Sequence, residues 1–170
     1  MTDELPVTPA GYHTVTPWIA ARDANGLVAF IERVFGGRET PGSRVTSADG
    51  RIDHVEVRLG DSTIMLFDRR EGWLETPGLL KVYVEDVDAV AQRAREAGAT
   101  VVTEPTPLFF GETVARVRDP WGNLWWIHER TEEVDPSELE ARMRNPTETA
   151  RMRYVQESLD RALRELATKK

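Results

Sequence analysis

Few side chains in this sequence have the chemistry of a metal site or a catalytic base. The chain contains three histidines; His54 stands two residues before Glu56, and His128 directly precedes Glu129. Residues two apart on a strand share a face, and imidazole with carboxylate is a common ligand set for zinc and iron. His54, Glu56 and His128 therefore form one candidate metal site. The alternative, which we favour, makes His54 a half-buried, hydrogen-bonded histidine and His128 a surface residue.

Aromatic residues concentrate just after the sequence Asp119-Pro-Trp-Gly-Asn123. Asp-Pro begins a turn, Gly-Asn can end it at positive φ, and apolar residues flank both sides, which predicts a tight β-hairpin. Trp125 and Trp126 follow the turn, and on a strand they point to opposite faces. One indole can then face a core or a pocket, while the other faces whatever covers the sheet.

The rest of the composition excludes several classes of function. Because there is no cysteine, thiolate metal sites, disulfides and cysteine nucleophiles are absent. No phosphate-binding loop or nucleophile elbow occurs. A net charge of -7 without a basic patch argues against nucleic acid and anionic membranes as partners. The sequence shows neither a membrane span nor a signal peptide, so we expect a cytoplasmic protein.

Hydrophobic periodicity predicts a strand, a helix and three further strands in the first half of the chain. Asp23 can cap the helix with its carboxylate, and Gly36 can end it in the left-handed conformation. The predicted elements are a strand over residues 12–21, the helix after Asp23, and strands over residues 38–47, 52–59 and 62–68.

The second half repeats this order after a linker over residues 68–78. Asp86 and Gly98 bound its helix as Asp23 and Gly36 bound the first, at offsets of 63 and 62 residues. Such a match indicates an internal duplication, the alternative being two unrelated runs of the same elements. The predicted strands cover residues 79–84, 100–103 and 112–117, with a loop over 105–111, and the last strand follows the turn at Asp119.

The tail, residues 136–168, is predicted to be helical. Pro136 begins one helix, Asn145-Pro146 ends it, and Thr147 can cap a second. A narrow apolar stripe on the second helix packs against this chain's own sheet or a second subunit, unless the helix is mostly solvated. The stripe consists of Met152, Val155, Leu159, Ala162 and Leu166.

Together, the paired modules, the Val84-Glu-Asp-Val-Asp88 segment and the Asp119-Pro-Trp-Gly-Asn123 turn resemble the vicinal oxygen chelate superfamily. This superfamily includes glyoxalase I, extradiol dioxygenases and bleomycin-resistance proteins, and the resemblance, over residues 12–130, is to its glyoxalase-like members. It implies an α+β fold in which two β-α-β-β-β modules, residues 12–68 and 79–130, form a cup-shaped, eight-stranded mixed sheet. The C-terminal helical extension lies outside the resemblance.

Metal-using relatives take their ligands, typically His or Gln, Glu, His and Glu, from the first and last strands of each module. The resemblance, aligned by the capping aspartates and the turn glycines, places Thr16, Met65, Leu79 and Trp126 at these four positions. None of these side chains is a normal ligand for nickel, zinc or iron. The resemblance therefore implies a member that lacks the family's metal site and needs no cofactor.

The same resemblance turns an apolar, aromatic set of side chains toward the cup. Aromatic walls suit flat or cationic organic molecules, and the acidic balance agrees with a cation, although these rings could instead fill the cup completely. The expected ligand-binding residues are Thr16, Trp18, Met65, Phe67, Leu79, Tyr83, Phe109, Phe110 and Trp126, with Trp73 and Trp121 at the rim.

Functions of different classes remain open at this point. We favour a metal-independent protein that binds and sequesters a small aromatic, amphipathic or cationic molecule, rather than an enzyme. The alternatives are a metal-dependent lyase, dioxygenase or isomerase that uses His54, Glu56 and His128, and an interaction role in which the tail recruits a partner. Because relatives commonly form homodimers, we also expect a homodimer, with the cup built within one chain or across two.

Overall fold

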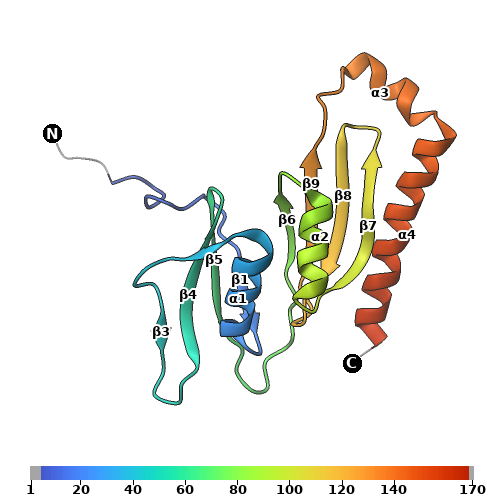
Figure 1. Cartoon of the computed structure of the whole chain (residues 1–170). Coiled ribbons are helices and arrows are strands. Elements are labelled where there is room, and N and C mark those ends of the chain that lie inside the picture. Colours follow the sequence, from blue (N-terminus) through green and yellow to red (C-terminus); the bar gives the residue numbers. More distant parts are fainter. Residues whose placement is uncertain (1–4, 169–170) are drawn as a thin grey trace. The chain divides into compact units, whose positions relative to one another are not determined.

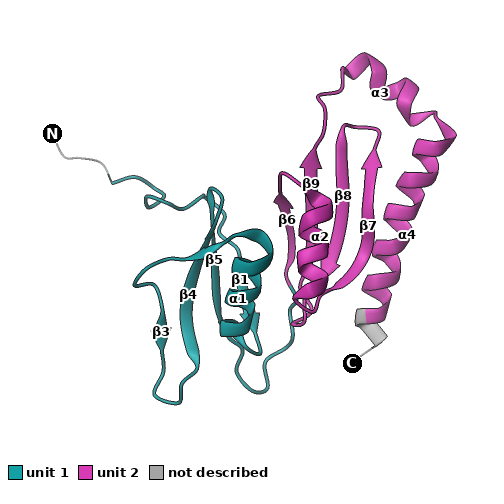
Figure 2. Ribbon diagram, in the orientation of Figure 1, with its two compact units in different colours: residues 1–77 teal, residues 78–170 magenta. Residues whose placement is uncertain are grey.

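The computed structural model describes residues 5–168, and the side chains of residues 5–165. The chain divides into two compact units, residues 1–77 (unit 1) and residues 78–170 (unit 2), as Figure 2 shows. Each unit contains a sheet with a helix packed on one face. The predicted α+β class is therefore confirmed.

Unit 1 has the predicted order of elements except that one predicted strand is divided into two: β1 (Trp18–Ala21), α1 (Ala24–Phe35), β2 (Arg38–Glu39), β3 (Val45–Thr46), β4 (Ile52–Leu59) and β5 (Ser62–Asp68) (Figure 1). The strand order is β1-β5-β4-β2, β3 also pairs with β4, and β1 runs parallel to β5. The carboxylate of Asp23 accepts a hydrogen bond from Gly26 N at 2.9 Å, and Gly36 ends α1 at a φ of 73°. Both helix boundaries are as predicted.

The alternation of β4 decides which face of the unit 1 sheet forms the core. Val55 and Val57 are fully buried on the side of α1, whereas His54 and Glu56 lie on the opposite, partly exposed face. The core between α1 and the sheet also contains Ile19, Leu27, Ile31, Val34, Ile64 and Leu66.

Two predictions for unit 1 are wrong in detail. The first strand begins at Trp18 instead of residue 12, because Tyr12 leaves the sheet and its hydroxyl donates to a Glu56 oxygen at 2.5 Å. The segment 38–47 forms two strands of two residues instead of one strand, with Gly42 at a φ of 78° between them.

Unit 2 contains β6 (Leu79–Tyr83), α2 (Val87–Glu96), β7 (Thr100–Leu108), β8 (Glu112–Arg118), β9 (Leu124–Arg130), α3 (Pro136–Met143) and α4 (Pro146–Thr168). Its strand order is β6-β9-β8-β7, with β6 parallel to β9. These four strands correspond in order and direction to β1, β5, β4 and β2 of unit 1. The two units share one topology, as the repeat requires. Their strands form two sheets, of five and four strands, in place of one eight-stranded sheet.

Strand β7 is longer than predicted and includes Pro105 and Pro107, which we expected in a loop. Proline cannot donate to a strand ladder, but β7 lies at an edge of its sheet, and its register with β8 shifts between Thr103 and Thr106. An edge position and an irregular register together accommodate the two prolines.

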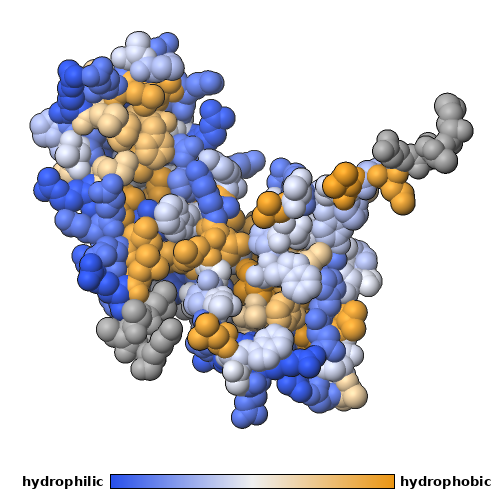
Figure 3. Space-filling model, turned by 180° about the vertical axis from the view of Figure 1, so that it is seen from behind, coloured by the Kyte–Doolittle hydropathy of each residue, from blue (hydrophilic) through white to orange (hydrophobic). Residues whose placement is uncertain are grey.

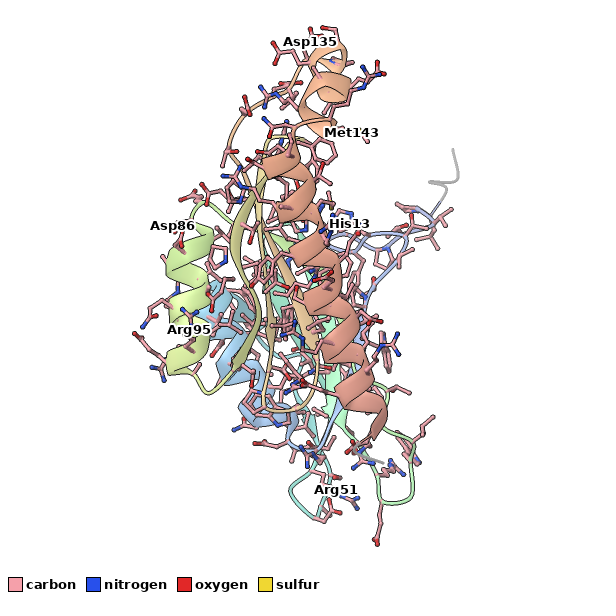
Figure 4. All side chains as sticks on the ribbon, turned by 90° about the vertical axis from the view of Figure 1, so that its right-hand side faces the viewer. His13, Arg51, Asp86, Arg95, Asp135 and Met143 are labelled. Atoms are coloured by element: carbon pink, nitrogen blue, oxygen red, sulfur yellow. The ribbon has the colours of Figure 1, made fainter. Side chains whose placement is uncertain are left out.

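Helix α4 packs on β7, and the apolar stripe is the face that does so. Val155 and Ala162 are buried, Met152 and Leu159 are half-buried, and Leu166 lies outside the described side chains. The stripe therefore packs against the chain's own sheet. Figures 1 and 4 show α4 and α2 on different sides of the unit 2 strands.

Both tail helices begin with a side-chain cap. The carboxylate of Asp135 accepts from Ser137 N at 2.8 Å at the start of α3. At the start of α4 the amide oxygen of Asn145 accepts from Thr147 N at 2.9 Å, so Asn145 is the cap and Thr147 already belongs to the helix. The predicted break at Asn145-Pro146 is correct, whereas the predicted cap is wrong.

Candidate functional site

The turn between β8 and β9 is organised by the buried carboxylate of Asp119. One of its oxygens accepts from Trp121 N at 3.0 Å and Asn123 N at 2.9 Å, and the other accepts from Asn123 Nδ2 at 2.8 Å and Trp125 Nε1 at 2.9 Å. Burial raises the pKa of Asp119, and the four hydrogen bonds oppose that rise. The predicted hairpin is confirmed, and Asp119 holds its shape.

Trp125 and Trp126 point to opposite faces of β9, as predicted. Trp125 is fully buried on the α2 side of β9. Glu129, four residues further along the same strand face, accepts a hydrogen bond from Val87 N of α2. Trp126 lies on the other face, which we call the α4 face: Lys81, Tyr83, Arg116, Trp126 and His128. Seen from behind (Figure 3), unit 2 carries apolar surface bordered by hydrophilic side chains.

Arg116 is the most deeply placed cation of the α4 face, at 5% exposure. Its guanidinium lies 4.3 Å from the centre of the Trp126 ring, and Nη1 donates to Val155 O of α4 at 2.6 Å and to Thr103 Oγ1 at 3.1 Å. Thr103 Oγ1 also lies 2.7 Å from Ser158 Oγ. Burial lowers the pKa of Arg116, but guanidinium titrates so far above neutrality that it stays charged.

His128 lies beside Arg116 on the same face and is 94% buried, so its predicted surface position is wrong. Its Nδ1 donates to a Glu112 oxygen at 2.6 Å, and the Lys81 ammonium lies 3.8 Å from that oxygen. Burial lowers the pKa of His128, and the Glu112 carboxylate opposes this. The imidazole is therefore neutral near pH 7, with Nε2 as a hydrogen-bond acceptor.

In unit 1, the face opposite α1 carries Trp18, His54, Glu56, Met65 and Phe67, and we call it the open face. The Trp18 and Phe67 rings meet edge-on with centroids 5.5 Å apart. Trp73, from the segment after β5, meets Phe67 in the same way at 6.0 Å. This face is an aromatic surface with a polar margin.

Glu56 forms that polar margin together with two side chains. The Tyr12 hydroxyl donates to Oε1 of Glu56, and His54 Nε2 lies 3.2 Å from the same oxygen. The Tyr12 hydrogen bond lowers the pKa of Glu56, assisted by His54 and opposed by burial. His54 is half-buried and hydrogen-bonded, as predicted.

The residues predicted to bind ligand divide between the two units. The open face of unit 1 holds Trp18, Met65 and Phe67. In unit 2, Tyr83 and Trp126 belong to the α4 face, and Leu79 lies on the same side of the sheet. Thr16 precedes β1, and its hydroxyl donates to His13 O at 3.3 Å.

Phe109 and Phe110 lie at the turn between β7 and β8. Phe110 packs on the cluster of Leu108, Val114 and Val155, and Phe109 lines a pocket beside α4. The sequence alone does not place the tail helix beside these two rings, and their role in ligand binding stays a prediction.

The side chains at the family's metal positions do not fit a metal ion. Of the expected positions Thr16, Met65, Leu79 and Trp126, two are displaced by the strand register: Trp18, not Thr16, lies opposite Met65, and Lys81, not Leu79, lies opposite Trp126. Neither the expected nor the observed side chains are normal ligands for a divalent metal. Among the residues that the structure describes, no three His, Asp or Glu side chains are grouped to hold a metal. His54 pairs with Glu56 and His128 pairs with Glu112 within their own units.

Sequence reasoning missed Arg116, Lys81 and Glu112 as site residues. Their signal was the register of the hairpin, because Arg116 and Trp126 become neighbours once the turn at Asp119 is fixed. Charged residues on alternate positions of a strand are usually solvated, so the strand pattern alone does not single them out.

Topology and site together define a glyoxalase-type protein without the usual metal ligands. The family model of the Glyoxalase/Bleomycin resistance protein/Dioxygenase superfamily matches residues 12–127, and the chain belongs to this family. No helix within residues 5–168 is long and apolar enough to cross a membrane.

Individual relatives agree with this assignment. An uncharacterized protein of Mycobacterium tuberculosis is 31% identical over 140 residues, which cover 76% of this chain and 81% of the relative. The structure of TioX from Micromonospora sp. ML1 has a TM-score of 0.58 at 27% identity, covering 69% of this chain and 98% of TioX. A family enzyme from Burkholderia phytofirmans PsJN, at 22% identity, covers 68% of this chain and 96% of its own with a TM-score of 0.55, and shares the fold.

Proposed function

We propose that this protein binds and sequesters a small aromatic or amphipathic molecule without a metal ion. The observation that carries the proposal is the exposure of large rings on the sheet faces away from α1 and α2. Trp18 exposes 60% of its surface and Tyr83 exposes 59%, whereas the side chains beneath the helices are buried. Burying a large apolar side chain is worth about 1.5–3 kcal/mol, so these rings are a source of binding energy that folding leaves unused.

The chemistry of the metal positions supports the metal-independent part of the proposal. Met65 within β5 and Trp126 within β9 offer a ligand apolar contact and stacking, at about 0.5–1.5 kcal/mol for each aromatic pair. The acidic net charge of the chain, taken alone, favours a cationic ligand.

Titration with a panel of aromatic compounds, followed by tryptophan fluorescence and thermal unfolding, tests the proposal. A ligand at 100 times its Kd should raise the free energy of unfolding by about 2.7 kcal/mol. Added chelator, nickel or zinc should change neither the affinity nor the stability. Absence of quenching and of stabilisation across the whole panel would refute the proposal.

A matched pair of variants locates the binding surface. Trp18→Ala should weaken binding several-fold with little effect on stability, because the ring is mostly exposed. Leu163→Ala removes an exposed apolar side chain from α4 and should leave binding unchanged. Equal effects of the two substitutions on affinity would show that the open face is not used.

We also propose that the protein is a cytoplasmic homodimer. Strand β6 is an edge strand of the unit 2 sheet, and its Leu79 and Tyr83 are exposed, which is costly for an isolated chain. Light scattering after size exclusion should give twice the chain mass of 19.2 kDa. A mass of one chain at micromolar concentration would contradict the dimer.

A further inference from the structure

We propose that the α4 face of unit 2 recognises an anionic group on the ligand, a carboxylate, phosphonate or phosphate, through the guanidinium of Arg116. The inference rests on the proposed binding function and sharpens it, because it reverses the charge that the acidic composition favours.

Arg116 is a buried cation without a carboxylate partner among residues 5–165. Two other cations of this sheet have one: Arg118 Nη1 lies 3.7 Å from a Glu165 oxygen, and Lys81 Nζ lies 3.8 Å from Glu112. The guanidinium of Arg116 instead contacts a carbonyl, a hydroxyl and the face of Trp126. Dipoles and a π face compensate only part of the lost hydration of a charge, so an anion would complete the environment.

Two buried donors on this face are also unused. Within the described part of the chain, Nε of Arg116 and Nε1 of Trp126 are buried and have no hydrogen-bond partner. Arg116 uses only Nη1 for its contacts with Thr103 and Val155. A guanidinium edge binds carboxylate and phosphate oxygens with two parallel hydrogen bonds, and such charge-assisted bonds are about twice as strong as neutral ones.

The other charges around the site do not cancel this preference. Glu112 borders the α4 face, and its carboxylate is engaged by His128 Nδ1 and Lys81. His128 is neutral near pH 7 and offers Nε2, which is buried and unpartnered, as an acceptor for a hydroxyl or N–H of the ligand. Distant acidic residues are screened within about 8 Å at physiological salt, so the local guanidinium determines the sign.

A purely structural role is the competing explanation for Arg116. Its Nη1 ties the Val155 carbonyl of α4 to the sheet, which by itself could account for the burial. The two roles differ in what they require: tethering α4 needs the hydrogen bonds of Nη1, and anion binding needs the positive charge. Variants that separate charge from hydrogen bonding therefore separate the roles.

The test uses three probes with one ring system and different charges: 1-naphthoate, 1-naphthalenemethanol and 1-naphthylmethylammonium, with binding measured by calorimetry. We expect the carboxylate to bind the full-length protein at least tenfold more tightly than the alcohol or the ammonium. In Arg116→Gln the preference should disappear, and in Arg116→Lys much of it should return. Inorganic phosphate should raise the Tm of the wild type more than that of Arg116→Gln.

Two controls guard against an effect of misfolding. Thr103→Val removes the hydroxyl next to Arg116 but keeps the guanidinium, so it should lower Tm and preserve the preference. Arg118→Gln removes an equally charged residue two positions away on the same strand and should change the preference less than twofold.

Each outcome has a defined meaning. Equal or tighter binding of the ammonium probe, or an unchanged preference in Arg116→Gln, overturns the anion site and leaves the proposed function standing. If no naphthyl probe binds but phosphate stabilises through Arg116, the aromatic function fails and the anion site stands. If neither naphthyl probes nor phosphate act on the wild type, both are overturned.

Discussion

The buried carboxylate of Asp119 allows a stability prediction with a worked magnitude. Asp119→Asn keeps the shape of the side chain but replaces one acceptor oxygen with an amide that faces donors. If the amide takes the place of the second oxygen, the hydrogen bonds from Asn123 Nδ2 and Trp125 Nε1 are lost and donor faces donor. Hydrogen bonds to a charged group contribute about 1.5–3 kcal/mol each, which gives about 3–6 kcal/mol for the pair.

Part of that loss is offset, because the substitution also removes a buried charge whose pKa is raised by burial. We therefore expect Asp119→Asn to lower the free energy of unfolding by about 2–4 kcal/mol. Urea denaturation followed by tryptophan fluorescence and by far-UV circular dichroism measures this change, with the m-value as the check on two-state behaviour.

A control variant and a double-mutant cycle test whether the loss comes from the Asp119 carboxylate. Asp86→Asn changes an exposed N-cap in the same unit, where Asn caps as well as Asp, and should cost less than about 0.5 kcal/mol. In a double-mutant cycle with Trp125→Phe, the Asp119 effect should shrink by at least about 1 kcal/mol. A loss below about 1 kcal/mol in Asp119→Asn, or no coupling to Trp125, would show that the carboxylate does not organise the turn.

Three further predictions follow from single contacts. Gly111→Ala should destabilise by more than 2 kcal/mol, because φ is 81° and the new Cβ would lie 2.5 Å from Glu132 O; Gly50→Ala, at a φ of 85° with open space, should cost about 1 kcal/mol, and equal losses would contradict the clash. Burial lowers the pKa of His128, so as the pH falls the unfolded chain binds a proton at this residue before the folded chain does. The free energy of unfolding should therefore fall below about pH 6.5, by at most about 1.4 kcal/mol per pH unit. Denaturation curves of wild type and His128→Gln between pH 7.5 and pH 5 check this, and an equally steep fall in the variant would assign it to other groups. Val155→Ala should cost about 1–3 kcal/mol and detach α4, seen as faster amide exchange along α4; a wild-type exchange pattern would show that Val155 does not anchor the helix.

Local signals in the sequence determined most of the fold. The caps at Asp23 and Asp86, the positive φ of Gly36 and the turn at Asp119 depend on neighbours within a few residues, and all were predicted. Periodicity then predicted the strands and helices of the repeat, and the motifs at Val84–Asp88 and Asp119–Asn123 carried the resemblance to the family.

The errors concern residues whose environment depends on distant segments. Tyr12 lies outside the first strand, where its hydroxyl donates to Glu56, 44 residues away, and His128 is buried although it stands near the polar end of β9. Arg116 was overlooked because its burial requires α4, which the sequence places only as an amphipathic helix without a partner. The charged residues of the α4 face were thus out of reach of sequence reasoning, whereas the role of the aromatic residues in ligand binding stays a prediction.

The bond between Asp119 and the Trp125 indole has a spectroscopic consequence. The five tryptophans give five indole N–H signals in a nitrogen-15 correlation spectrum, and the Trp125 proton, hydrogen-bonded and fully buried, should exchange with deuterium only when unit 2 unfolds. Trp18 and Trp73 of unit 1, which are exposed, should exchange within the dead time. The exchange rate of the Trp125 indole proton therefore reports the rate at which unit 2 opens, without any label beyond the isotope.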